Sequence, residues 1–257
     1  MKYGFLIFLF FAAHMVSAQP STVYNLNFTD LATRWDEAIP LGNGQLGALI
    51  WKKENTIRLS LDRADLWDER KAFEIEKHDF KWVQQQLKSN SYQAAQQWGD
   101  SPYDRSPYPT KLPAAAMTFN LAKFGKVVSN VLDIQTAVHT LKFDDGKTLT
   151  SFIHATNPMG YFEITAKDIG DLGPELIPHQ YETKTNTDEQ KSVVDGQSLA
   201  RLGYKQGNIV KMGNAQLLHQ ETYDHHFFEV MLCWEKVSST KLIGYWTISN
   251  DEKVKKQ

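Results

Sequence analysis

Residues 34–51 read RWDEAIPLGNGQLGALIW and place three glycines and one asparagine between two apolar runs. Residues 42–44, Gly-Asn-Gly, tolerate positive φ, so the backbone can turn sharply there. Pro40 precedes the turn, where its missing N–H does little harm. Apolar side chains then alternate over residues 46–51, which predicts a strand that leaves the turn.

The same β pattern recurs along the chain and predicts a mainly β protein, a large antiparallel β-sandwich with a short helical insert. Asp144-Asp145-Gly146 is typical of a hairpin turn. Residues 100–113, with four prolines, and the polar residues 172–197 are expected to be irregular connections. The predicted strands are 22–28, 46–51, 56–61, 117–121, 126–134, 137–143, 149–154, 160–166, 208–212, 227–234 and 241–249.

Residues 63–98 differ from the rest because they are rich in Lys, Glu and Gln. Apolar side chains recur at helical spacing over 80–87 and again over 92–98, on either side of Ser89-Asn90-Ser91. This pattern predicts two short amphipathic helices. We expect their aromatic face to pack against a sheet.

The N-terminus is typical of a secretory signal peptide. Lys2 precedes the apolar run Phe5–Ala13, and the small residues of Val16-Ser17-Ala18 follow. The run is too short to span a bilayer core of about 30 Å. We therefore expect 1–18 to be a signal peptide, cleavage after Ala18, a secreted or periplasmic product, and no membrane span after cleavage.

The remaining chain divides into one folded domain, 19–250, and a charged tail, 251–257. The net charge of −2 gives no electrostatic attraction to nucleic acid, so we expect no nucleic-acid partner. Cys233 is the single cysteine and cannot form an internal disulfide. It is expected to be a small buried side chain rather than a catalytic thiol, which would need base partners nearby.

Two groups of polar residues deserve a chemical interpretation. The first, Asp62, Asp65, Asp68 and Glu69, surrounds Trp67. Sugar hydrolysis commonly uses two carboxyl groups, whereas acids at the start of a helix stabilise its dipole. Solvation and helix capping explain this cluster without catalysis, and a catalytic pair is the alternative.

The second group is His219, Glu221, Asp224, His225 and His226. On a strand, adjacent histidines point to opposite faces and cannot share one ion. The spacing of known zinc motifs is absent as well. We therefore predict a polar cluster at a loop edge, with no metal site.

Four segments together resemble a known enzyme family. Residues 35–50 resemble the W-x-E-A-L-P-L-G-N-G-x-L-G-A string that opens the N-terminal domain of family 95 glycoside hydrolases, the α-L-fucosidase family. Residues 59–67 occupy the place of its L-N-E-D-x-L-W segment. Residues 111–117 resemble an L-P-A-G-R-L segment, and 132–137 resemble L-D-L-x-x-A. Departures at Arg63 and Ala115 place the chain in a side branch.

The resemblance implies a β-supersandwich that packs on a helical (α/α)6 barrel, with the catalytic residues in that barrel. This chain has no series of helical segments, so the barrel is expected to be missing or on a separate chain, and no catalytic residue can be assigned. A glycan substrate, a fucosylated one by resemblance, and no cofactor are expected. Trp35 and Trp67, which flank the turn and the acidic segment, are predicted with Asn43 and Gln45 to bind substrate.

Two other functions stay open. One is a stand-alone secreted carbohydrate-binding or accessory module without hydrolytic activity, which the many aromatic residues favour. The other is an exported structural protein that binds no sugar.

Overall fold

The computed structural model describes residues 20–71, 76, 79–100, 107–181 and 199–251. The predicted signal peptide and nearly all of the predicted tail lie outside the described residues. Within them, none of the helices is both long and apolar enough to cross a membrane.

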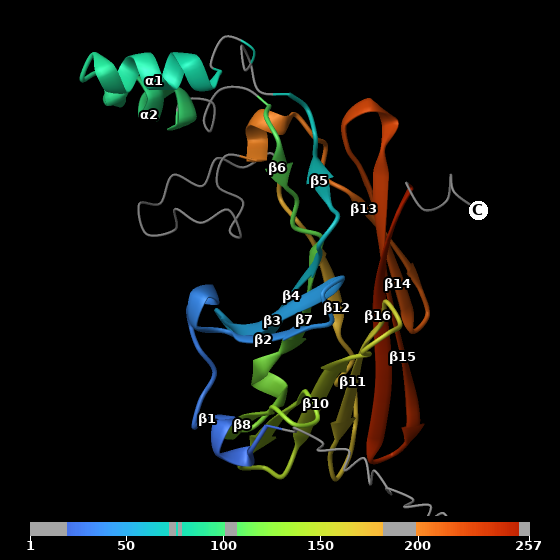
Figure 1. The fold of residues 1–257 in the computed structure, drawn as a ribbon. Helices are drawn as coiled ribbons and strands as arrows, with labels where there is room; N and C mark the ends of the chain where they lie inside the picture. The colour runs from blue at the N-terminus through green and yellow to red at the C-terminus, as the bar shows by residue number, and fades with distance from the viewer. Residues whose placement is uncertain (1–19, 72–75, 77–78, 101–106, 182–198, 252–257) are drawn as a thin grey trace, which may run out of the picture.

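Most of the described chain forms two antiparallel sheets (Figure 1). The larger sheet has nine strands, in the spatial order β1 (Leu26–Phe28), β8 (Val127–Asp133), β9 (Val138–Phe143), β10 (Thr148–Ile153), β11 (Gly160–Thr165), β16 (Lys241–Asn250), β15 (Phe227–Ser238), β14 (Ala215–Glu221) and β13 (Asn208–Met212). The smaller sheet has five, in the order β12 (Glu175–Pro178), β7 (Ala115–Asn120), β4 (Thr56–Arg63), β3 (Leu46–Lys53) and β2 (Ile39–Gly42).

Short elements complete the described fold. A two-stranded sheet joins β5 (Trp67–Asp68) to β6 (Thr110–Lys111), and the α-helices are α1 (Phe80–Lys88) and α2 (Tyr92–Asp100). The single-turn 3₁₀ helices are η1 (Thr22–Tyr24), η2 (Trp35–Glu37), η5 (Leu121–Lys123), η7 (Leu199–Leu202) and η8 (Tyr223–His225).

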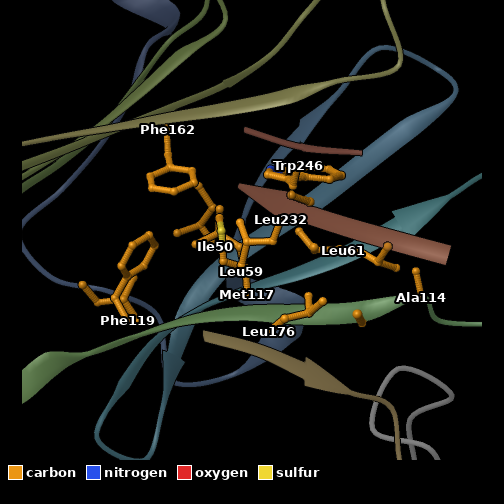
Figure 2. Packing of buried hydrophobic residues seen from close by; sticks show 14 of the residues in the cluster. Ile50, Leu59, Leu61, Ala114, Met117, Phe119, Phe162, Leu176, Leu232 and Trp246 are labelled. Atoms are coloured by element: carbon orange, nitrogen blue, oxygen red, sulfur yellow. The ribbon is translucent and has the colours of Figure 1, made fainter. Parts of the chain in front are cut away.

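The core lies between the two sheets (Figure 2). Alternate residues of β3 and β4, such as Ile50 and Leu59, are at most 3% exposed. They face Phe162, Leu232 and Trp246 from the larger sheet, which are equally buried. Because every second side chain of a strand lies on the same face, this alternation buries one face of each sheet. The predicted mainly β sandwich is confirmed.

The glycine-rich turn joins β2 to β3 as the sequence predicts. Only Gly44 in it adopts positive φ, at +86°. Pro40 is part of β2 and pairs with Leu49. A proline is tolerated here because β2 is the last strand of its sheet, where one side of the backbone needs no partner.

Both predicted helices form. Asp79 caps α1 by accepting a hydrogen bond from Trp82 N, and Asn90 adopts φ of 54° between the helices. The expectation that their aromatic face packs on a sheet is wrong: the helices contact each other and lie away from both sheets, beyond β5 and β6 (Figure 1). Phe80 is consequently 74% exposed and Leu87 55%.

Several segments differ from the sequence prediction, and among them β2, β5 and β6 are strands that the local pattern did not predict. The first predicted strand begins late, because the hydroxyl of Ser21 caps η1 before β1. In the segment predicted to be irregular, β12 forms because Leu176 pairs with Met117 and is buried. β14 was not predicted at all, although Leu218 in it is fully buried. Residues 182–197 of the predicted connection lie outside the described part of the chain.

Candidate functional site

The outer face of the five-stranded sheet brings the family-like segments together. Pairing of β3 with β4 aligns Leu49 with Ser60 and Gly47 with Asp62, and these residues alternate with core residues. Pairing of β2 with β3 adds Pro40 beside Leu49. Residues distant in sequence therefore form one continuous surface.

A pocket of about 330 Å³ lies on this surface. It is lined by residues from segments 40–49, 58–62 and 111–115, together with His179. Three of the four segments that carry the resemblance to a glycoside hydrolase domain therefore line it, whereas residues 132–137 lie at the end of β8 in the other sheet. The volume of the pocket is at the lower end of the range typical of small-ligand sites.

A fixed ion pair lies at this pocket. The Nζ atom of Lys111 donates to Asp62 Oδ1 at 2.5 Å and to the carbonyl oxygens of Arg63 and Leu112 at 2.9 and 3.0 Å. Three acceptors use all three ammonium protons and hold the side chain in one place. The Asp62 side chain remains 47% exposed, so its carboxylate can accept hydrogen bonds from a ligand.

A second polar group centres on Ser60. Its hydroxyl oxygen lies 3.0 Å from Trp51 Nε1 and 3.2 Å from Arg58 Nε, and both nitrogens donate to it. The Arg58 guanidinium also lies 5.9 Å from the Trp51 ring. The pocket thus combines an apolar part, near Pro40 and Leu49, with positioned groups of both charges.

His179 supplies a neutral imidazole. Burial, with smaller contributions from Arg58 and Lys53, lowers its pKa to about 4. Its Nε2 atom is buried and has no hydrogen-bond partner within the described residues. The ring packs edge-on against Tyr181, with 5.2 Å between centroids.

The structure separates the four residues predicted to bind substrate. Trp67 lies beside the pocket, because β5 pairs it with Lys111. It is 46% exposed, and its Nε1 donates to the Ala64 carbonyl at 3.0 Å. Trp35 is half-buried in η2 and does not line the pocket, nor does Gln45.

Asn43 uses its side-chain amide to stabilise the fold. Its Oδ1 accepts from the backbone N–H groups of Gln45 and Leu46 at 2.9 and 2.8 Å. Its Nδ2 donates to the carbonyl oxygens of His154 and Asn157, in the β10–β11 connection. These bonds shape the turn and tie the two sheets together. Glycan binding by the four residues remains a prediction.

The acidic cluster does not begin a helix, because Trp67 and Asp68 form β5. Asp65 pairs with Arg63 and Asp68 with Arg70. Asp68 is fully buried and also accepts a hydrogen bond from the Tyr204 hydroxyl. Burial alone would raise the pKa of Asp68, but hydrogen bonds from Arg70 and Tyr204 hold it below its usual range. Burial and the same bond raise the pKa of Tyr204.

The histidine cluster is likewise divided. His219 on β14 lies 3.1 Å from Glu229, whereas His226 lies 2.7 Å from Asp251. Asp224 and His225 belong to η8 and adopt positive φ. In the described part of the chain, no group of three or more His, Cys, Asp or Glu side chains could hold a metal ion.

Sequence reasoning missed Arg58, Lys111 and His179. Arg58 could have been placed from the alternation of residues 56–61, which puts it on one face with Ser60. No local pattern marks His179, because its segment reads as a polar connection and joins the sheet only through β7.

Comparison with known protein families matches residues 26–210 to "Glycosyl hydrolase family 65, N-terminal domain". The chain belongs to this family. The family 65 N-terminal domain is a glycoside hydrolase domain, which agrees with the sequence resemblance at that level, while family 95 itself is not confirmed. No curated protein was found to match the chain.

Proposed function

We propose that this family 65 N-terminal domain serves an exported glycoside hydrolase of the α-L-fucosidase type, acting on fucosylated glycans. One observation carries the proposal: three sequence segments that resemble the fucosidase family line a single pocket. The same segments also supply core residues on the opposite face of the sheet, but Asp62 and Lys111 in them face the pocket and are not needed to fill the core.

The catalytic residues in this proposal belong to a helical barrel domain outside these 257 residues. The pocket presents polar groups to the glycan or to that domain. Lys111 and Asp62 form a preorganised ion pair, and the Pro40–Leu49 surface offers apolar contact. Such groups orient a sugar without performing the chemistry themselves.

Hydrolysis assays of the full chain test the catalytic part of the proposal. We expect no turnover of an aryl α-L-fucoside by the pure protein. If the pure protein hydrolysed the fucoside and Asp62→Asn abolished that activity, the catalytic residues would lie in this domain, which would contradict the proposal.

Calorimetric titration with fucosyllactose tests the substrate class. We expect saturable heat that Lys111→Met and Asp62→Asn reduce, with melting temperatures measured alongside. Lys123→Met is the matched control, since Lys123 forms a similar ion pair with Asp171 at 2.6 Å outside the pocket. Absence of heat with the wild-type chain, or equal loss in the control, would argue against a fucose site here.

A second function is a stand-alone carbohydrate-binding module without hydrolytic activity. Exposed aromatic side chains on the nine-stranded sheet, among them Phe152 and Tyr245, favour it. The DNA that follows the codon for Gln257 separates the two proposals: helical repeats in the same frame support the hydrolase, and an immediate stop codon supports the module.

Export is part of both proposals. We expect the secreted or periplasmic product to begin at Gln19. Mass spectrometry of the mature protein that retains residues 1–18 would contradict this.

A further inference from the structure

A groove crosses four strands on the outer face of the nine-stranded sheet. Its volume is about 430 Å³. Antiparallel pairing aligns β10, β11, β16 and β15 in this order, so residues from the four strands form straight rows. Two such rows, two residues apart along each strand, form the walls.

One wall is aromatic. Phe152 pairs with Tyr161, Tyr161 with Tyr245, and Tyr245 with Cys233. The rings of Phe152 and Tyr161 are stacked, with 5.0 Å between centroids and 13° between planes. Phe152 is 36% exposed and Tyr245 40%. Three rings on adjacent strands therefore form a firm apolar strip that solvent reaches.

The other wall is mainly polar. Thr150 pairs with Glu163, Glu163 with Ile243, and Ile243 with Glu235. Lys241 Nζ lies 2.8 Å from Glu163 Oε2 and orients that carboxylate. Ionised carboxylates accept hydrogen bonds and donate none. A ligand in the groove must offer donors to this wall and an apolar surface to the other.

We propose that this groove binds a neutral hexose oligosaccharide. A sugar ring carries hydroxyl donors around its rim and C–H groups on its faces, which matches the two walls. The rows span three interstrand spacings, about 14 Å, so the ligand is a short chain rather than a single sugar. The volume is within the range of small-molecule sites, and an apolar lining with a few fixed polar groups is typical of them.

Other occupants fit the two walls less well. An apolar partner would bury the carboxylate of Glu235, and the Glu163–Lys241 ion pair, without adding a hydrogen-bond donor, which is costly. A second copy docked face to face would bring the same carboxylates together. Anionic lipids or acidic glycans would meet like charge.

This site rests on the second function proposed above, the carbohydrate-binding module, and names its site and ligand class; it is separate from the fucoside pocket. It lies on the nine-stranded sheet, whereas the pocket near Lys111 lies on the five-stranded sheet. The inference therefore holds or fails whether or not fucosylated glycans bind at that pocket.

Calorimetry of the full chain with cellohexaose, maltohexaose and mannohexaose tests the groove, and trigalacturonic acid serves as the acidic counterpart. None of these probes carries fucose. We expect saturable binding of at least one neutral probe and none of the acid. Tyr245→Ala and Glu235→Gln should each weaken the binding by about tenfold or more, because a wall contact is lost.

The matched controls lie on β15, the strand that carries Glu235, and on the same face of the sheet. Phe227→Ala removes an aromatic ring that packs on His219, and Glu229→Gln removes a carboxylate that pairs with His219. Both should leave the affinity unchanged. Cys233 gives an independent measurement. It was expected to be buried, but it is half-buried and lines the groove because its side chain lies on the outer face of β15. It is the single thiol of the chain, so bound oligosaccharide should slow its reaction with an aromatic disulfide reagent.

Absence of heat with all three neutral probes would overturn the inference. Equal weakening by the groove variants and the controls would overturn it as well, as would unchanged thiol reactivity at saturating ligand. A concentration-dependent dimer that Tyr245→Ala abolishes would show that a second copy covers this face instead.

Discussion

Truncation of Asp68 should be among the most damaging single changes to the stability of this domain. The carboxylate is fully buried. It accepts from Arg70 Nε at 3.0 Å, from Arg70 Nη2 at 2.5 Å and from the Arg70 backbone N–H at 3.0 Å. The Tyr204 hydroxyl donates to Oδ2, the oxygen that also accepts from Arg70 Nη2. Asp68→Ala leaves these donors inside the protein without an acceptor.

Breaking a buried ion pair by removing one partner costs about 3 to 5 kcal/mol. We expect about 3 kcal/mol, the low end, because the Arg70 side chain retains 30% exposure and Nη2 still donates to the Leu202 carbonyl. In a domain of this size such a loss lowers the melting temperature by about 6 to 12 °C. Scanning calorimetry and urea unfolding measure both quantities.

Asp36→Ala is the matched control, since Asp36 and Arg34 form an ion pair with the same two-residue separation. That pair is exposed, so no measurable change is expected. If Asp68→Ala loses no more stability than Asp36→Ala, the buried pair does not stabilise the fold and the reasoning is wrong.

The pH dependence gives a second check on the same residue. The folded-state pKa of Asp68 is lowered, so its stabilisation is present above the unfolded pKa of about 3.9 and is lost as the pH falls through the folded value. The difference in stability between wild type and Asp68→Ala should therefore shrink in acid. A difference that stays constant down to strongly acidic pH would contradict this assignment.

Three further predictions follow from other positions. Asn43→Ala should lower the free energy of unfolding by about 2 kcal/mol in urea titrations, because four hydrogen bonds are lost; unchanged stability with reduced glycan affinity would instead assign Asn43 to the ligand. Burial lowers the pKa of His139 to about 4, so the free energy of unfolding should fall as the pH drops from 6.5 toward 4. His139→Gln should reduce the slope of that fall by up to about 1.4 kcal/mol per pH unit. An unchanged slope would show that His139 is not its source. Gly160→Ala would place its Cβ 2.1 Å from the buried Trp246 ring and should cost about 3 kcal/mol, whereas Gly47→Ala, with its nearest contact at 3.7 Å, should be mild; equal melting temperatures for the two variants would contradict the packing.

Local pattern was enough to predict most strands. The alternation of apolar residues over 46–51 and 56–61 follows the two-residue period of a strand, and these segments form β3 and β4, respectively. Local pattern failed for β12, where four residues become a strand because Leu176 pairs with Met117. Local pattern also failed to predict β14, because most of its side chains are polar although Leu218 in it is buried.

The candidate site was predicted less completely, because it too depends on pairing between segments that are distant in sequence. Trp67 was singled out and lies beside the pocket, yet Lys111 became its neighbour only through the pairing of β5 with β6. Asn43 looked available for a ligand in the sequence, whereas the fold uses its amide to bridge to His154 and Asn157. A side chain's availability depends on what the rest of the chain brings near it.

The sequence by itself determined the class of this protein: a glycine turn, alternating strands, two helices and a string typical of glycoside hydrolase N-terminal domains. These features are local, since they depend on backbone preferences and on a period of two or 3.6 residues. Tertiary structure alone decided which residues share a surface. The pocket near Lys111, the aromatic groove at Tyr245 and the buried Asp68 each require strands distant in sequence to pair in one register, and register follows from packing of the whole core.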